Sequence, residues 1–264
     1  MAGASTTAGK PLLLEISGVA KSFGGLRALS RITLQIDAGR IHGLIGPNGA
    51  GKTTLFNVIT GVSSATAGTV RFEGQDITRL RPHKIAARGI SRTYQLVRPF
   101  YELTAHENVK VGVLFGRADA HHNIDADEEA VAMLERVGLA AKADYLASEL
   151  NLGERKRLEI AKALATRPRL LLFDEVLAGL NPAEAAQAVR LFQEIDASGV
   201  TILMIEHNMQ AIMAACAHIF VLHHGELIGQ GSPQDVVRDA KVVEAYLGQR
   251  DLRLECTRRK PAHA

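Results

Sequence analysis

The fold is decided by the stretch Gly46-Pro47-Asn48-Gly49-Ala50-Gly51-Lys52-Thr53, which is followed by Thr54. It fits the pattern G-x-x-x-x-G-K-[ST], in which glycines allow backbone N–H groups to turn inward around phosphate oxygens. Lys52 adds a positive charge, and the Thr53 hydroxyl is a ligand for Mg²⁺. Because average residue frequencies give a chance match in about one chain of this length in a hundred, the stretch predicts a phosphate-binding loop.

The residues on either side of this loop support the same prediction. The apolar run at residues 41–45 is typical of a buried strand. Residues 52–62 show the i, i+3, i+4, i+7 spacing of one apolar helical face, at Leu55, Val58, Ile59 and Val62. A helix N-terminus favours anions, so the order strand, loop and helix predicts a nucleotide phosphate site.

Strand-like segments recur along the chain, and helix-like stretches separate several of them. The segments are Leu12–Ile16, Ile32–Ile36, Ile41–Ile45, Leu170–Phe173, Thr201–Ile205 and Ile219–Leu222. This alternation predicts an α/β sheet architecture. Between about residues 97 and 153 the strand signals fade, and helical spacing at residues 127–137 indicates an inserted helical subdomain. The sequence contains no second phosphate loop, so a machine with two nucleotide sites must recruit another chain.

Composition narrows the class of protein. The 264 residues are 47% hydrophobic and 22% charged, as in ordinary globular proteins. A formal charge of +3 does not predict a nucleic-acid partner, and the apolar runs fall short of the roughly 18 residues of a membrane helix. Cys216 and Cys256 indicate no disulfide framework, so we expect a reducing, cytoplasmic compartment. We expect a flexible tail at 1–11, one domain at 12–250 and a basic tail at 251–264.

A pair of carboxylates follows another apolar strand. Leu170–Phe173 leads into Asp174 and Glu175, at the edge where a parallel sheet opens onto its ligand. We expect Asp174 to hold the magnesium shell and Glu175 to polarise the attacking water, because phosphoryl transfer depends on positioning and charge. The alternative, an acidic strand end that faces solvent, is disfavoured by the phosphate loop upstream.

With these motifs, residues 12–248 resemble an ABC-type nucleotide-binding subunit. The resemblance implies an α/β, P-loop NTPase (RecA-like) core with an antiparallel β subdomain and an inserted α-helical subdomain. It also implies that the protein binds ATP and Mg²⁺ and hydrolyses the nucleotide.

The resemblance assigns roles to residues outside the two motifs. Phe23 stands where the family stacks an aromatic ring on adenine, and an ordinary core phenylalanine is the alternative. Gln95 matches the glutamine that contacts magnesium and water and senses the membrane subunit. His207 matches the histidine that contacts the terminal phosphate, so it joins Lys52, Glu175 and Gln95 in the expected catalytic set. Residues 178–181 occupy the place of the loop that crosses to the partner subunit.

The family signature, usually LSGGQ, is altered to Leu150-Asn151-Leu152-Gly153-Glu154. Residues 157–164 keep helical spacing, and Asn151 is a good helix cap that can present N–H groups to a γ-phosphate. Glu154 is unfavourable there because like charges repel. In the family, one subunit's signature, here Asn151, Gly153 and Glu154, completes the nucleotide site of the other. We therefore hypothesise a heterodimer in which a second ABC subunit closes this chain's loop.

Local stretches resemble the branched-chain amino-acid (Liv-type, LivG-like) importer ATPases, at residues 21–29, 92–100, 157–161, 178–182, 205–209 and 245–248. Urea and amide importers share much of this set and stay alternatives, because an ATPase subunit does not touch the cargo. The implied partners are transmembrane permease subunits and, indirectly, a substrate-binding protein, with the chain peripheral on the cytoplasmic face of the inner (plasma) membrane. Phe100 and Tyr101 suit a docking surface near Gln95, with core packing as the alternative.

Two other function classes remain open. A soluble ABC ATPase without a transporter, such as an assembly factor for metal clusters, would be distinguished by its genomic neighbours. A regulatory module that binds nucleotide without hydrolysis is disfavoured by Glu175 and His207. The pairs His121-His122 and His223-His224 lack a Cys or carboxylate cluster at ligand spacing, so we interpret them as solvated loop residues.

Overall fold

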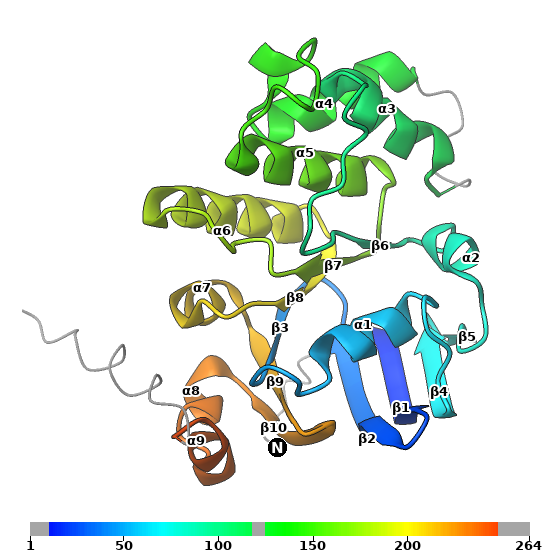
Figure 1. The fold of residues 1–264 in the computed structure, drawn as a ribbon, viewed down its shortest axis with the longest axis vertical. Helices are drawn as coiled ribbons and strands as arrows, with labels where there is room; N and C mark the ends of the chain where they lie inside the picture. Colours follow the sequence, from blue (N-terminus) through cyan, green and yellow to red (C-terminus); the bar gives the residue numbers. More distant parts are fainter. Residues whose placement is uncertain (1–10, 118–124, 248–264) are drawn as a thin grey trace, which may run out of the picture.

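The computed structural model describes residues 11–117 and 125–247. The described chain forms two sheets and a layer of helices (Figure 1). A six-stranded sheet has the order β10-β9-β3-β8-β7-β6, and a four-stranded sheet has the order β2-β1-β4-β5. The predicted tails at 1–11 and 251–264 lie outside the described residues apart from Pro11, and so does His121-His122.

The six-stranded sheet is built from short apolar strands. Its parallel members are β3 (Ile41–Ile45), β6 (Ile90–Arg92), β7 (Leu170–Asp174), β8 (Thr201–Ile205) and β9 (His218–His223), and β10 (Glu226–Gly231) runs antiparallel to β9. Every residue of β3, β7 and β8 is buried, as expected for parallel strands that are covered on both faces. The predicted bounds of β3 and β8 are confirmed. The carboxyl ends of the parallel strands meet at one edge, which brings distant motifs together.

The four-stranded sheet is antiparallel and consists of β1 (Leu12–Phe23), β2 (Leu26–Asp37), β4 (Ala67–Phe72) and β5 (Gln75–Asp76). Along β2, Ile32, Leu34 and Ile36 are buried while the residues between them are exposed, so one face covers the core. The strands predicted at 12–16 and 32–36 were too short. Both continue to a tight turn at Gly24, which has a φ of 57°.

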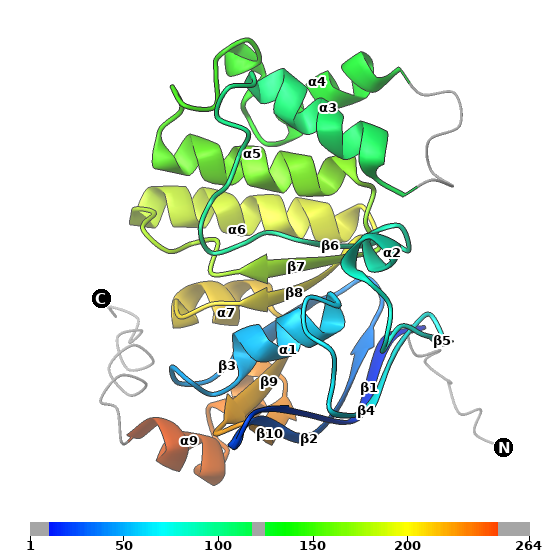
Figure 2. The same cartoon turned by 45° about the vertical axis from the view of Figure 1, so that its right-hand side comes forward.

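Helices flank the two sheets and also form a separate layer (Figures 1 and 2). The flanking helices are α1 (Lys52–Ile59), α2 (Pro82–Ala86), α6 (Pro182–Ala197), α7 (Met209–Ala215), α8 (Pro233–Val236) and α9 (Ala240–Leu247). The separate layer, green at the top of Figure 1, contains α3 (Ala105–Phe115), α4 (Ala126–Arg136), η2 (Ala140–Lys142) and α5 (Leu152–Ala165).

Two helices differ from their predicted ends. Helix α1 stops at Ile59 rather than Val62, because the Thr60 hydroxyl bonds back to a carbonyl of the last turn and Gly61 has a φ of 71°. The helix predicted at 127–137 is α4, which begins one residue earlier and ends one residue earlier. Its start is set by Asp125, whose side chain accepts hydrogen bonds from two N–H groups of the first turn.

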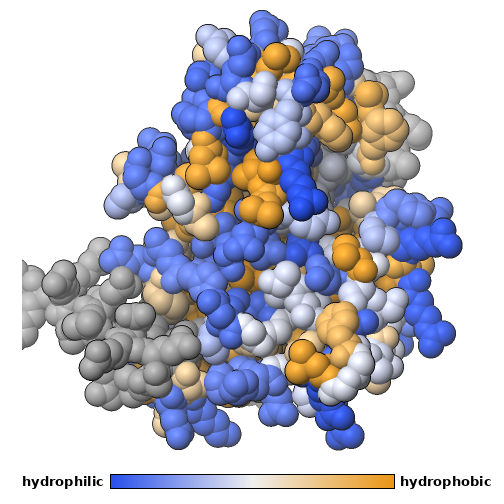
Figure 3. Space-filling model, viewed as in Figure 1, coloured by the Kyte–Doolittle hydropathy of each residue, from blue (hydrophilic) through white to orange (hydrophobic). Residues whose placement is uncertain are grey.

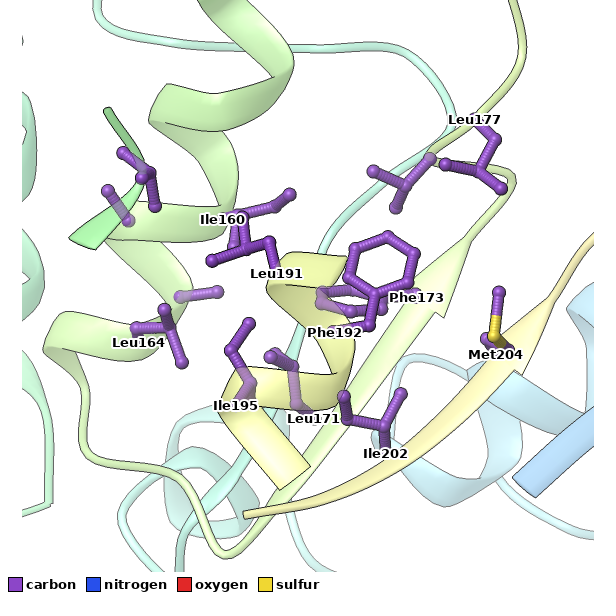
Figure 4. Packing of buried hydrophobic residues seen from close by; sticks show 14 of the residues in the cluster. Ile160, Leu164, Leu171, Phe173, Leu177, Leu191, Phe192, Ile195, Ile202 and Met204 are labelled. Carbon is purple, nitrogen blue, oxygen red and sulfur yellow. The ribbon is translucent and has the colours of Figure 1, made fainter. Parts of the chain in front are cut away.

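Two apolar clusters pack against opposite faces of the six-stranded sheet. Leu171 and Phe173 of β7 belong to the cluster with α5 and α6, where the Phe173 ring lies 4.6 Å from that of Phe192 (Figure 4). Leu170 and Leu172 belong to the other cluster, which contains α1 and the antiparallel sheet. Because β7 is packed from both sides, the positions of the residues that follow it are well defined.

Part of the apolar surface is exposed. Figure 3 shows hydrophobic side chains among hydrophilic ones over the helical layer, and exposed apolar residues there include Leu114, Phe115 and Leu152. Phe100 and Tyr101 are 49% and 44% exposed, so the alternative of core packing for them is wrong. Among the described helices, none combines the length and the apolar character needed to cross a bilayer.

Candidate active site

The phosphate loop connects β3 to α1. Gly51 has a φ of 101°, and a Cβ at this position would lie 2.7 Å from the Ala28 carbonyl oxygen and 2.8 Å from Leu29 Cδ2. A larger residue would therefore force the loop away from the antiparallel sheet. No described side chain caps the N-terminus of α1, so its first N–H groups are available to an anionic ligand.

Lys52 lies inside this loop and is 6% exposed. Its Nζ donates to the carbonyl oxygens of Gly46 at 2.7 Å and of Pro47 at 3.1 Å. Burial lowers the pKa of Lys52, while the nearby charges of Glu175 and Asp174 oppose this shift. The ammonium group is thus placed between the loop and two carboxylates, where a phosphate would complete its charge pairing.

A pocket of about 510 Å³ extends from the loop to the tip of the β1–β2 hairpin. Phe23 lies in its wall and is 51% exposed, so it is not the ordinary core phenylalanine of the alternative interpretation. Lys21 Nζ lies over the Phe23 ring, 4.7 Å from the ring centroid. An exposed ring at the mouth of a phosphate-binding pocket is available for stacking on a planar base. The remaining lining residues are Leu26, Arg27, Ala28, Asn48, Gly49, Ala50, Gly51, Lys52, Thr53, Thr54, Glu175 and His224.

Glu175 is held at the carboxyl edge of the sheet by residues from two other segments. It follows β7 with a φ of 53°, a conformation that a non-glycine residue adopts when its surroundings impose it. Its N–H donates to the Ile205 carbonyl of β8 at 2.9 Å. Glu175 Oε2 accepts from Gln95 Nε2 at 2.6 Å, and Oε1 lies 2.9 Å from His207 Nε2. Both carboxylate oxygens are therefore oriented by side chains that the sequence predicts for this site.

Asp174 pairs with an arginine that the motifs do not predict. Arg92, at the end of β6, donates to Asp174 Oδ2 at 2.6 Å, and each side chain is 4% exposed. The same guanidinium donates to Asn57 Oδ1 at 2.7 Å and lies 4.8 Å from the centre of the Tyr94 ring. Loss of one partner of such a buried pair leaves an uncompensated charge, so Arg92 and Asp174 act as a unit. The only indication of this role for Arg92 in the sequence is that a basic residue stands three positions before Gln95.

The oxygen groups near the loop have the chemistry of a magnesium site. Thr53 follows Lys52 at the start of α1 and contributes a hydroxyl in the wall of the pocket. Asp174 contributes a carboxylate, and the amide of Gln95, whose nitrogen donates to Glu175, contributes an oxygen. Hydroxyl, carboxylate and amide oxygens are the ligands that Mg²⁺ prefers. The residues present thus fit this ion.

The altered signature forms the start of α5, away from the lining of this pocket. Asn151 caps the helix as predicted, because its side chain accepts from the Glu154 N–H at 2.9 Å. Glu154 completes a capping box by accepting from the Asn151 N–H at 3.0 Å, and it pairs with Lys142 at 2.7 Å. Burial works against the charged form of Glu154, but the hydrogen bonds from Lys142 and Asn151 lower its pKa. Gly153 lines a different cavity of about 340 Å³ between α5 and α6.

The second histidine pair differs in part from the interpretation as solvated loop residues. His223 is the last residue of β9 and is half-buried, whereas His224 is an exposed turn residue in the wall of the nucleotide pocket. Their ring centroids lie 4.1 Å apart. Within the described parts of the chain, no cluster of three metal-ligating side chains is present.

These features define a class of protein. A glycine-rich loop between a buried strand and a helix, next to two carboxylates at the edge of a parallel sheet, is the site of a P-loop nucleotide-hydrolysing enzyme. An antiparallel sheet on one side and a helical layer on the other complete the domain.

Comparison with known proteins identifies the family. Residues 29–178 match the model of the ABC transporter family, and residues 226–251 match that of the branched-chain amino acid ATP-binding cassette transporter. The chain belongs to the ABC transporter ATP-binding family. It is an α/β P-loop ATPase that binds and hydrolyses ATP.

Individual relatives cover nearly the whole chain. The high-affinity branched-chain amino acid transport ATP-binding protein BraF of Pseudomonas aeruginosa is 39% identical over 90% of this chain and 98% of its own length. LivG of Escherichia coli, which bears the same description, is 37% identical with the same coverage. Among solved structures, the ADP conformation of an ATP-binding cassette of an ABC transporter superposes with a TM-score of 0.82 at 33% identity, covering 91% of this chain and 100% of that one.

Proposed function

We propose that this chain is the ATP-hydrolysing subunit that energises an ABC importer for branched-chain amino acids through ATP-driven closure of a dimer. The observation that carries the hydrolytic part is the Glu175 carboxylate, which is oriented on both oxygens by Gln95 and His207 beside the phosphate loop. The cargo is supported by relatives named as branched-chain amino acid transport proteins over nearly their full length.

The residues divide the work of hydrolysis among them. The loop N–H groups and Lys52 bind the phosphates, and Phe23 stacks on the adenine. Thr53, Asp174 and Gln95 would hold Mg²⁺, which supplies charge neutralisation of the phosphates when bound. Glu175 positions the attacking water and accepts its proton as the water adds to the terminal phosphate. His207, whose Nε2 lies 2.9 Å from Glu175 Oε1, contacts that phosphate. The charge of Lys52 stabilises the negative charge that develops on the phosphate.

The proposed transporter contains further subunits. In a dimer, the signature at Asn151, Gly153 and Glu154 faces the partner's nucleotide. Its absence from the lining of this chain's own pocket supports this part of the proposal. A second ABC ATPase, in a heterodimer, closes the loop of this chain with its own signature. Transmembrane permease subunits dock near the exposed Phe100 and Tyr101, and a substrate-binding protein delivers cargo to them. In this assembly the chain lies peripherally on the cytoplasmic face of the plasma membrane.

The hydrolytic role is tested by Glu175→Gln in the assembled pair. This change keeps the size and shape of the side chain but removes the charge that polarises water, so we expect turnover to fall about 10²- to 10⁴-fold. Binding of a fluorescent ATP analogue should change little. Glu159→Gln is the matched control, because Glu159 pairs with Lys162 on α5 outside the pocket. Undiminished turnover in the Glu175 variant would contradict the assignment.

The cargo is tested by reconstituting the assembly, with its permeases and binding protein, in lipid vesicles. We expect leucine, isoleucine or valine to stimulate ATP hydrolysis and to enter the vesicles. Stimulation by urea or a short amide instead would assign the chain to the related importers. ATP hydrolysis that no permease and no cargo alters would favour a soluble ATPase without a transporter.

A further inference from the structure

Lys156 is a buried cation on the second turn of α5. It is 6% exposed, and its Nζ donates to the Val176 carbonyl at 2.8 Å and also to the carbonyl of Ala178. Lysine is seldom fully buried unless its charge is paired. Here two backbone carbonyls from one short turn hold the ammonium group, so the side chain ties α5 to residues 176–178.

Glu206 holds the same turn through its middle residue. It is 4% exposed, and its Oε1 accepts from the Leu177 N–H at 2.8 Å. Burial lowers the pKa of Lys156, and the charge of Glu206 is the largest effect that opposes this shift. Two buried ionisable side chains therefore hold three consecutive residues: Lys156 through two carbonyls and Glu206 through an N–H.

The turn at 176–178 lies between two parts of the shared nucleotide machinery. It begins directly after Glu175, and the Ala178 N–H donates to the Glu175 carbonyl at 3.2 Å. It continues into residues 178–181, the loop expected to reach the partner chain. Because Glu175 already has an imposed left-handed backbone, a shift of this turn would change the direction of its carboxylate.

Lys156 also belongs to the helix that starts with the altered signature. The Asn151–Glu154 capping box forms the first turn of α5, and Lys156 lies two residues beyond it. A nucleotide that contacts this first turn would displace α5 as a rigid helix. Because Lys156 on α5 is bonded to residues 176–178, the displacement of the helix would also move the turn after Glu175.

We propose that Lys156 is a positioning residue that couples the signature helix of this chain to its own hydrolytic carboxylate, so that nucleotide on the partner's loop sets the geometry of Glu175. This inference rests on the proposed function, because it requires a dimer with two shared sites. It assigns Lys156 no contact with nucleotide. Its consequence is cooperativity between the two sites.

The test is steady-state ATP hydrolysis by the assembled pair in the presence of permeases, with Lys156→Met in this chain. Methionine keeps much of the apolar stem and removes the donor. We expect kcat to fall about tenfold or more, since misplacement of a catalytic group by about 1 Å costs on this scale. The KM for ATP should stay within about twofold, and the Hill coefficient should fall towards one.

Arg157→Met is the matched control on the same helix. Arg157 NH1 donates to the Gly138 carbonyl at 3.1 Å, so the control also removes one side-chain hydrogen bond, but that bond lies within the helical layer. We expect its kcat and Hill coefficient to match the wild type. Lys156→Met with unchanged kcat and Hill coefficient, or equal losses in both variants, would overturn the inference.

The double variant Lys156→Met with Glu206→Gln separates positioning from charge balance and protects against loss of folding, because it leaves no unpaired buried charge. If Lys156 serves merely to neutralise Glu206, hydrolysis returns to the wild-type rate and the inference fails. If Lys156 positions the turn, the double variant stays slow, while Lys156→Arg, which keeps the donors, recovers part of the rate. A wild-type pair that does not hydrolyse ATP would instead refute the proposed function.

Discussion

Glu206 shows how one buried carboxyl group makes stability depend on pH. Burial raises its pKa from 4.5 to about 7, although a hydrogen bond from Leu177 and the charge of Lys156 act in the opposite direction. Between these two pH values the folded chain holds a proton that the unfolded chain has released. The contribution of Glu206 to stability is therefore complete below about pH 4.5 and is lost as the pH rises through about 7.

Glu206→Gln should remove this pH dependence. The amide keeps an acceptor for the Leu177 N–H and cannot ionise, so the stability difference between variant and wild type should grow from pH 5 to pH 8. The rise in the pKa of Glu206 from 4.5 to about 7 corresponds to a change in this stability difference of at most about 3 kcal/mol. Urea unfolding at several pH values measures it.

His42 also titrates, so the free energies of unfolding of the Glu206→Gln variant and the wild type must be compared as a difference at each pH. Burial lowers the pKa of His42 to about 4, so its own contribution is lost as the pH falls below 6.5. This contribution is common to variant and wild type and cancels when their free energies of unfolding are subtracted. A constant difference across the range would show that Glu206 is ionised in the folded chain throughout.

At the scale of elements, the altered signature is a stable helix start. Asn151→Ala removes the acceptor for the Glu154 N–H and should cost about 1 kcal/mol of folding stability. Asn151→Ser keeps a capping oxygen and should cost much less. Chemical denaturation of the isolated chain measures both changes. Equal losses would mean that the side-chain bond of the cap contributes nothing.

Elements with a strong local signal could be predicted from the sequence. The mainly apolar segments of β3 and β8 mark strands covered on both faces, and their predicted ends were correct. Strands β1 and β2 extend beyond their predicted apolar stretches, because Arg27 and Ser22 pair across a hairpin through backbone bonds that leave no apolar pattern. An apolar pattern in the sequence marks buried residues. The strand pairs at the hairpin tip are exposed, so they leave little such pattern.

Site residues could be predicted where a motif or a family position marks them, and the structure brings Gln95, Glu175 and His207 into contact. The roles of Arg92 and Lys156 could not be predicted. Arg92 pairs with a side chain 82 residues away, and Lys156 donates to backbone carbonyls 20 and 22 residues away. Every residue has a backbone carbonyl, so the sequence does not indicate which carbonyl a side chain will contact. Such contacts require the packed structure, in which α5 lies against the turn after β7.

At the scale of the whole molecule, the pocket and the signature occupy different places. The pocket contains the loop, Phe23 and Glu175, whereas Gly153 lies on α5 beside Glu184. A change in the signature should therefore leave this chain's own nucleotide binding intact and impair the assembled pair. This separation is what distinguishes a shared site from a self-contained one.

Gly153→Asp tests the separation. A Cβ at Gly153 would lie 3.2 Å from Glu184 Oε1, so aspartate adds a negative charge next to an existing one, at the face expected to meet a partner's phosphate. We expect the isolated chain to bind a fluorescent ATP analogue with its Kd changed less than about twofold, because the phosphate loop is untouched. ATP turnover of the assembled pair should fall about tenfold or more, because the first turn of α5 is coupled through Lys156 to the turn after Glu175 and both sites are affected.

Gly153→Ala is the control, because its methyl group adds no charge and meets the movable end of Glu184 at 3.2 Å and Asn151 Oδ1 at an ordinary contact distance of 3.5 Å. It should retain most of the turnover of the pair. If Gly153→Asp weakened nucleotide binding by the isolated chain as strongly as it slowed the pair, the signature would belong to this chain's own site. The two effects can be told apart because one assay contains a single chain and the other contains both.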